Sequence, residues 1–278
     1  MPRPSSLLVV SVALVVPACA APVDVDTASS TAAVASVFDG SGGDWIDLTH
    51  SFSSETLYWP TDTSGFQLER QSYGVTEGGW FYASNAFASA EHGGTHLDAP
   101  IHFAEGRLTT DRIPLAGLIG PAAVVDVSDR ATPDYQVSVA DLQAWESEHG
   151  ILPEGGILLL ATGWEKRWPD RAAYLGTDRV GPDAVAELRF PGLSPEAAQW
   201  LVEGRGIVAV GIDTPSLDYG QSQDFASHVI LFEQNIAGFE NVANLGGVPP
   251  AGAFAVALPM KIEGGSGGPL RIVAFVPR

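Results

Sequence analysis

Three of the six histidines in this 278-residue chain lie within eleven residues, in the segment HGGTHLDAPIH at positions 92–102. Two imidazoles followed by a carboxylate, without sulfur, are ligand types that bind hard or borderline divalent cations. Asp98 and the later histidines stand at +4, +6 and +10 from His92, and on extended backbone even offsets share one face. Two glycines and a proline disfavour a regular helix here. The spacing therefore predicts a strand-and-turn segment that bends around a metal ion.

A chance arrangement has to be weighed against this interpretation. A single histidine is more often a surface or core residue than a ligand, and H-x-x-x-H alone is common. Three histidines and one aspartate in a segment punctuated by Gly and Pro are much less common. Aromatic residues flank the segment and are candidates to hold a flat substrate, although most aromatic side chains belong to cores. These candidates are Trp59, Trp80, Phe81 and Phe103, with Trp59 the strongest.

The segment resembles the H-x-G-T-H-x-D-x-P-x-H signature of the cyclase family, which includes bacterial kynurenine formamidases and isatin hydrolases. The resemblance extends over the chain from Trp45 onward. Tyr58-Trp59-Pro60 is similar to the early Trp-Pro element of the family, and residues 211–216 (GIDTPS) are similar to the end of its mid-chain strand. Ser227-His228 followed by Glu240-Asn241 matches its second half-site.

The resemblance implies a role for each matching residue. His92, His96 and Asp98 would hold a first ion, with Glu240 completing the ligand set. Asp98 and Glu240 would bridge to a second ion bound by His228, since a carboxylate offers two oxygens. His102 would be the proton donor and acceptor, titrating near neutral pH. The family pattern allows one manganese or two zinc ions, and the N and O ligands fit either metal. Of the aromatic candidates named above, Trp59, Trp80 and Phe103 are predicted to contact the substrate.

The expected function is metal-dependent hydrolysis that opens a small cyclic amide or imide, or cleaves an aryl formamide. An isatin hydrolase-like activity is favoured over kynurenine formamidase because the stretch Trp164–Pro191 makes the domain longer, and residues 211–220 and 259–271 look more like isatin hydrolases. One alternative is a lipoprotein that binds a metal or small ligand without turnover. A second is a serine esterase, since residues 264–268 (GGSGG) formally match G-x-S-x-G. No helix is expected after this segment, so it is interpreted as a flexible loop.

Charge and cysteine content exclude several classes. The chain has 33 acidic and 14 basic residues, and so acidic a surface repels nucleic acid and anionic membranes. The partners expected are a small-molecule substrate, a second copy of the chain in a homodimer, as the resemblance implies, and no nucleic acid. Cys19 is the only cysteine, which excludes a disulfide or a thiolate site in the folded domain.

The first residues are expected to direct export. Residues 7–16 form an apolar run too short to span a bilayer and are followed by small residues, which indicates a signal peptide over 1–18. Cys19 lies where a lipoprotein cysteine would lie, so the chain is expected to be an exported, lipid-anchored protein; cleavage after Ala20 is the alternative. Residues 19–43 are rich in small and polar residues and are predicted to be a flexible linker. The hydrolase domain is predicted over 44–278.

Local patterns predict an α/β or α+β domain, and the family resemblance implies a single α/β domain with a three-layer β/β/α (swivelling) fold. A capping box at Ser138 predicts a helix ending at Gly150, and Ser194-Pro195 predicts another ending near Gly204. His50 and His149 are expected at the surface, and Asp213 is expected to be structural. Strands are predicted at 122–127, 157–161, 207–212, 254–258 and 271–276.

Overall fold

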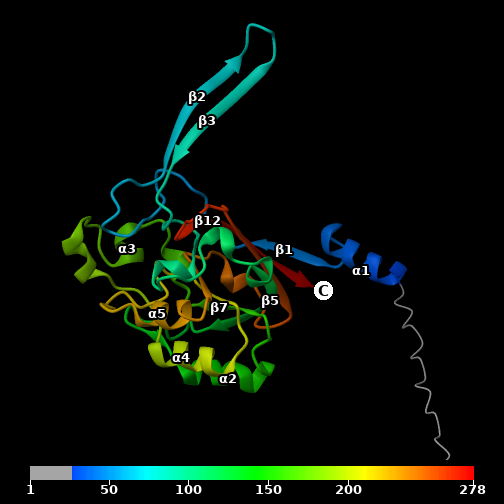
Figure 1. Cartoon of the computed structure of the whole chain (residues 1–278), viewed down its shortest axis with the longest axis vertical. Coiled ribbons are helices and arrows are strands. Elements are labelled where there is room, and N and C mark those ends of the chain that lie inside the picture. The colour runs from blue at the N-terminus through cyan, green and yellow to red at the C-terminus, as the bar shows by residue number, and fades with distance from the viewer. Residues whose placement is uncertain (1–26) are drawn as a thin grey trace, which may run out of the picture.

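The computed structural model describes residues 27–278, whose backbone is organised around one large β-sheet (Figure 1). The strand order is β1-β12-β11-β5-β7-β9-β10-β4, and β4 also pairs with β12. Seven strands therefore close into a ring, and β1 lies outside it against β12. The strands of this sheet are β1 (Gly43–Asp47), β4 (His96–Asp98), β5 (Ile119–Asp126), β7 (Ile157–Ala161), β9 (Ala209–Ile212), β10 (Ala237–Glu240), β11 (Ala253–Pro259) and β12 (Gly267–Pro277).

Alternation of side chains along the strands produces two hydrophobic cores. On β7, Ile157 and Leu159 point into the ring, where they meet alanines from β11 and β12. Leu158 and Leu160 point outward and pack under helices. Because successive side chains of a strand face opposite ways, one strand contributes to both cores. The two walls of the ring and one helical layer make three layers in the order β/β/α. This agrees with the α/β fold class and the layer arrangement expected in the sequence analysis.

The helical layer begins where the sequence signals predicted. The Ser138 side chain and the Asp141 side chain cap each other's backbone N–H groups, and this helix ends before Gly150. Ser194 accepts a hydrogen bond from Ala197 N at the start of the second helix. Both helices and the predicted central strands are confirmed, with strand ends differing by up to four residues. Three helices cover the outer face of the ring: α2 (Val139–His149), α4 (Pro195–Gly204) and α5 (Ala226–Phe232). The short strand pair β6 (Gln136–Val137) and β8 (Gly192–Leu193) lies beside them.

A long hairpin stands out from the rest of the molecule (Figure 1). It consists of β2 (Gln67–Val75) and β3 (Phe81–Ala88), which pair with each other and with no strand of the large sheet. The sequence analysis did not predict these strands. Large apolar side chains are exposed along both of them: Leu68, Tyr73, Val75, Phe81, Tyr82 and Phe87, with Trp80 in the turn that joins the strands.

The predicted linker over residues 19–43 is wrong for its second half. Thr27–Phe38 form helix α1, and β1 begins at Gly43. Small residues such as alanine do not oppose helix formation, and the end of this helix is tied to the domain. Trp45 Nε1 donates to Val37 O at 2.9 Å, and the Phe38 ring stacks on Trp45. The predicted signal peptide and Cys19 lie outside the described residues. Within residues 27–278, no helix has the length and apolar character needed to cross a membrane.

Candidate metal centre

The closure point of the ring carries the candidate ligands. Strands β4 and β10 are antiparallel, with Glu240 opposite His96 and Gly238 opposite Asp98. Residues two apart on a strand share a face, so His96 and Asp98 point the same way, and both are buried. The short strand is fully buried between β10 and β12. The sheet therefore places two carboxylates and one imidazole together, buried on the face opposite to Leu97 and Phe239, which point into the ring.

The other two histidines arrive from outside these strands. His92 precedes β4 and is separated from it by a turn in which Gly94 has a φ of +58°, a left-handed conformation that favours glycine. His228 lies on α5, which packs against the same face. The predicted strand-and-turn segment is thus confirmed, but strand periodicity accounts only for His96 and Asp98. His102 follows in a 3-10 turn at Pro100–His102.

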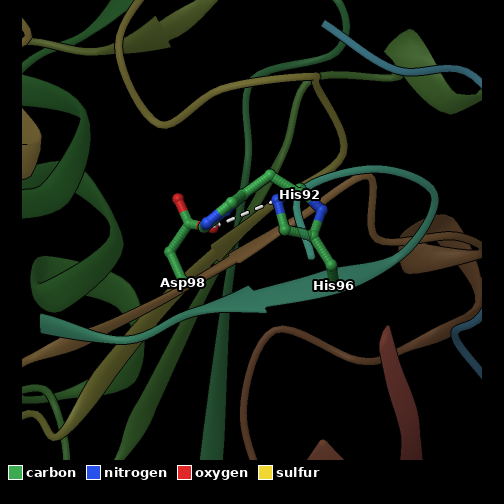
Figure 2. A group of neighbouring side chains, drawn as sticks. All are labelled: His92, His96 and Asp98. Atoms are coloured by element: carbon green, nitrogen blue, oxygen red, sulfur yellow. Dashed lines mark hydrogen bonds and ion pairs between the residues drawn. The ribbon is translucent and has the colours of Figure 1, made fainter. Parts of the chain in front are cut away.

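Four side chains converge on Asp98: His92, His96, His228 and Glu240. Figure 2 shows the first two of them beside Asp98. His92 Nδ1 is 2.6 Å from Asp98 Oδ1, and His96 Nε2 is 3.1 Å from the same oxygen. His228 Nε2 lies 3.4 Å from Asp98 Oδ2 and 3.0 Å from Glu240 Oε1. Two groups of three ligand atoms form, each with all atoms within 4.8 Å of one another, and Asp98 belongs to both. The groups are His92, His96 and Asp98, and Asp98, His228 and Glu240.

Burial of this cluster shifts the pKa values of its ionisable side chains. Burial disfavours the charge on Asp98, but the neighbouring histidines outweigh it and hold the pKa of Asp98 well below its usual value. Burial and the negative charge of Asp98 raise the pKa of Glu240. Burial also opposes protonation of His96, but Asp98 and Glu240 outweigh it and raise its pKa to about 9. Two buried carboxylates so close together require positive charge beside them.

The donor set fits a divalent metal ion as the source of that charge. His96 Nδ1 is 2.9 Å from Gly94 O, so it carries the proton and donates it. His96 Nε2 is directed at the carboxylates, 3.1 Å from Asp98 Oδ1, and it is buried without a hydrogen bond among the described residues. Without a metal the carboxylates favour a proton on this nitrogen, as the raised pKa of His96 shows; a divalent ion bound to the nitrogen lone pair would supply positive charge at the same place. The orphaned nitrogen is therefore the observation that favours a metal over an ordinary hydrogen-bonded cluster.

His102 lies next to the cluster without belonging to either group of ligands. Its ring stacks on His92 with centroids 3.8 Å apart and planes 18° apart. Burial, with the neighbouring histidines, lowers the pKa of His102 to about 4, although Asp98 opposes the shift. The expectation that this residue titrates near neutral pH is therefore wrong. The imidazole is neutral at pH 7 and able to accept a proton.

A cavity of about 320 Å³ opens onto the cluster and onto His102. This is the lower end of the size range of small-molecule sites. Trp59 and Phe103 line it as predicted, together with Phe225, which contacts both rings. Trp80 is not among the lining residues: it is 63% exposed at the hairpin turn, so its assignment to the substrate site of its own chain is wrong. Phe81 is on the hairpin too.

Some residues that shape the site had no recognisable sequence signal. Asp218 Oδ2 lies 2.6 Å from His228 Nδ1 and also accepts from the His228 backbone N–H. Asn241 Nδ2 donates to Gly94 O, which steadies the carbonyl that holds His96. A lone Asp ten positions before a histidine forms no pattern. Asn241 was noted in the sequence only because Glu240-Asn241 resembles the second half-site of the family.

The residues set aside in the sequence analysis have mixed outcomes. Asp213 is buried and accepts from Thr162 and from Trp164 N, with no hydrogen bond to a candidate ligand among those found, as expected of a structural residue. His149 is exposed as predicted. The surface assignment of His50 is wrong, because its ring stacks on Trp168 with centroids 4.3 Å apart and its Nε2 is buried.

The fold and the buried His/carboxylate site define a hydrolase with the ligands for a divalent metal. Comparison with known proteins agrees with this class. A family model described as "Putative cyclase" matches residues 46–219, and the chain belongs to the cyclase family. An isatin hydrolase from Roseibium aggregatum is 36% identical over 210 residues, covering 72% of this chain and 77% of the relative. A kynurenine formamidase from Salinibacter ruber is 29% identical over 233 residues, covering 82% and 95%.

Solved structures give the same result. An isatin hydrolase bound to the product analogue thioisatinate superposes with a TM-score of 0.79 at 31% identity, covering 91% of this chain and 99% of that one. Isatin hydrolase A from Ralstonia solanacearum gives a TM-score of 0.77 at 33% identity, covering 89% and 97%.

Proposed function

We propose that this chain hydrolyses a small cyclic amide or imide resembling isatin, opening the ring to a carboxylate and an amine. The observation that carries the proposal is the position of His102, a neutral imidazole beside a buried metal-ligand cluster in an aromatic-lined cavity. The extent of the similarity to isatin hydrolases, in sequence and in structure, supports an isatin-like ring over a formamide.

The residues divide the chemistry between them. His92, His96, Asp98, His228 and Glu240 would hold one or two divalent ions, Mn²⁺ or Zn²⁺. Such an ion lowers the pKa of water from about 15.7 towards 7 and polarises a carbonyl. The rings of Trp59, Phe103 and Phe225 would hold the flat substrate. His102 would accept a proton as the water oxygen bonds to the carbonyl carbon, then return it to the ring nitrogen as the C–N bond breaks.

A direct assay tests this proposal. The chain without residues 1–21 is incubated with isatin and Mn²⁺, then with excess chelator, and ring opening is followed by absorbance. Turnover that the chelator abolishes supports a metal-dependent isatin hydrolase. Turnover that resists the chelator would favour a serine esterase acting through Ser266. Metal binding with no turnover of any cyclic amide, imide, lactone or formamide would favour the binding lipoprotein.

We also infer that the protein works as a homodimer, held in part by the β2–β3 hairpin. An isolated two-stranded ribbon is marginally stable in water, and this one exposes seven large apolar side chains, Trp80 among them. Large apolar side chains gathered on one exposed element are typical of an interface.

The cellular location is a further part of the proposal. We infer export and anchoring through a lipid on Cys19, from the apolar run and small residues that precede it. Labelling cells with a radioactive fatty acid tests it: the chain is expected to carry label, and a Cys19→Ser variant is not.

A further inference from the structure

The segment GGSGG at 264–268 has no role in the function proposed above, yet it is held against the candidate ligands. Gly267 and Gly268 pair with Asp98 and Leu97 at the start of β12. Ala99 N donates to Ser266 O at 2.8 Å. Thr110 binds the segment from the other side, donating from Oγ1 to the carbonyls of Gly265 and Gly267. The expectation of a flexible loop is therefore wrong, because these bonds fix its backbone beside the metal site.

The Ser266 hydroxyl connects two side chains. Its Oγ is 2.6 Å from Glu91 Oε2 and 2.9 Å from His92 Nε2. The Ser266 backbone N–H donates to the same Glu91 oxygen at 3.0 Å. A hydroxyl has one proton and a carboxylate only accepts, so the Ser266 O–H donates to Glu91. The Ser266 oxygen is then left to accept, and its partner His92 Nε2 must carry a proton.

This direction of donation decides which nitrogen of His92 is available to a metal. With the proton on Nε2, the neutral ring has its lone pair on Nδ1. His92 Nδ1 is the atom that lies 2.6 Å from Asp98 Oδ1 and faces the cluster. A proton on Nδ1 instead would leave Nε2 as an acceptor opposite an oxygen whose only proton is already donated to Glu91. The chain from Glu91 through Ser266 to His92 thus favours the ring form that a cation needs.

The same contacts argue against Ser266 as a nucleophile. Ser266, His92 and Asp98 are in the order of a hydrolytic triad, but neither Ser266 nor Glu91 is among the residues that line the cavity. A nucleophile must reach the substrate, and a hydroxyl held by a carboxylate on the other side of His92 does not.

Close approach of the loop to His92 requires a glycine at 267. A Cβ at this position would lie 2.6 Å from His92 Cε1 and 2.6 Å from Leu97 O. Contacts this short do not occur with real side chains, so any larger residue would displace the imidazole or the loop. The glycine is thus part of the geometry that presents His92 to the cluster.

We propose that Glu91 and Ser266 are positioning residues that fix His92 in the Nε2-protonated form, so that Nδ1 is its metal-binding atom. This inference rests on the proposed metal site. Residues that hydrogen-bond to a metal-binding histidine typically contribute a factor of about 10 to 100 in metal affinity, and these two residues would act through one shared hydroxyl.

The test is metal affinity, measured by titrating Mn²⁺ and Zn²⁺ into the purified protein against a competing chelator. Ser266→Ala and Glu91→Gln are each expected to weaken binding about tenfold or more. The double variant should be no weaker than Ser266→Ala, because Glu91 acts through the hydroxyl that this variant lacks. The control is Ser147→Ala, an exposed serine bonded to its own helix, which should bind as the wild type does.

A second measurement reads the ring directly. In Zn²⁺-loaded protein with ¹⁵N-labelled histidine, the His92 Nε2–H proton should be visible by NMR in the wild type and lost in Ser266→Ala. Wild-type affinity in both variants, with His92→Ala abolishing binding, would overturn the positioning role and leave the metal site intact. A wild-type protein that binds neither ion would instead overturn the proposed function.

Discussion

Each histidine of the cluster hydrogen-bonds to another protein group through one ring nitrogen and directs its other ring nitrogen at the carboxylates. His96 donates to Gly94 O, His228 is held by Asp218, and His92 by Ser266. An imidazole with one nitrogen committed has a defined orientation and a defined lone pair. The three contacts thus explain why side chains from three separate segments form one preorganised ligand set.

Replacing His102 separates catalysis from metal binding. In His102→Ala the cluster keeps every ligand, so affinity for Mn²⁺ should be unchanged. Loss of the proton acceptor should lower kcat by about 10² to 10⁴. Steady-state kinetics and a metal titration on the same preparation check this. An equal loss of metal would mean that His102 is itself a ligand.

His50 provides a pH-dependent contribution to stability. Burial against Trp168 lowers its pKa to about 4, from an ordinary value of 6.5. The unfolded chain therefore takes up a proton between pH 6.5 and 4 that the folded chain does not, so stability falls as the pH falls through this range. At pH 4.5 the loss should be about 2 kcal/mol.

The matched variant is His50→Phe, which keeps a ring against Trp168 but cannot be protonated. Urea unfolding with chelator present, at pH 7 and pH 4.5, should show a smaller pH effect in this variant by about that amount. An identical pH effect in both proteins would show that His50 is protonated without cost in the folded state.

The site was predictable from the sequence where its residues are close together in the chain. His92, His96 and Asp98 share a short segment, and the glycines and proline around them exclude a helix. Asp218 and Glu91 could not be identified, because their roles depend on which segments the fold brings together. Trp80 was misassigned for the same reason. It precedes the metal-ligand segment in sequence, but the eight-residue strand β3 between them places Trp80 at the far end of the hairpin.

At the level of elements, local sequence signals identified the helices with capping residues and the strands with continuous apolar runs. Capped helices such as α2 and buried strands such as β7 carry their own patterns. The β2–β3 hairpin does not, because a ribbon exposed on both faces has no alternation of apolar and polar residues. Helix α1 was missed because its small residues resemble those of a flexible linker.

Polar substitutions on the hairpin test its role in dimer formation. Trp80→Ser combined with Phe81→Ser removes two large exposed rings without changing any buried contact of the domain. We expect sedimentation to show a dimer for the wild type and a weakened dimer or a monomer for this variant. Glu77→Gln, at the exposed hairpin turn, is the control and should remain dimeric. A monomeric wild type would refute the proposed dimer.

At the scale of the whole molecule, the metal site joins parts of the chain that are far apart in sequence. Asp98 lies on β4, which closes the ring by pairing with β10 and β12, and Glu240 lies on β10. His228 comes from the helical layer. A cation held by all three would therefore connect β4 and β10 to α5, while two buried carboxylates without it would oppose the same contacts.

Metal binding should consequently stabilise the entire domain. A ligand that binds only the folded state, at 100 times its dissociation constant, adds about 2.7 kcal/mol to the free energy of unfolding. For a domain of this size, each kcal/mol raises the melting temperature by about 2–4 °C. Calorimetry with Mn²⁺ or Zn²⁺ should show this increase, and excess chelator should reverse it. Asp98→Asn weakens both groups of ligands at once, so its melting temperature should respond little to metal. A wild-type melting temperature that does not change with metal would place the ion, if bound, outside the contacts that close the ring.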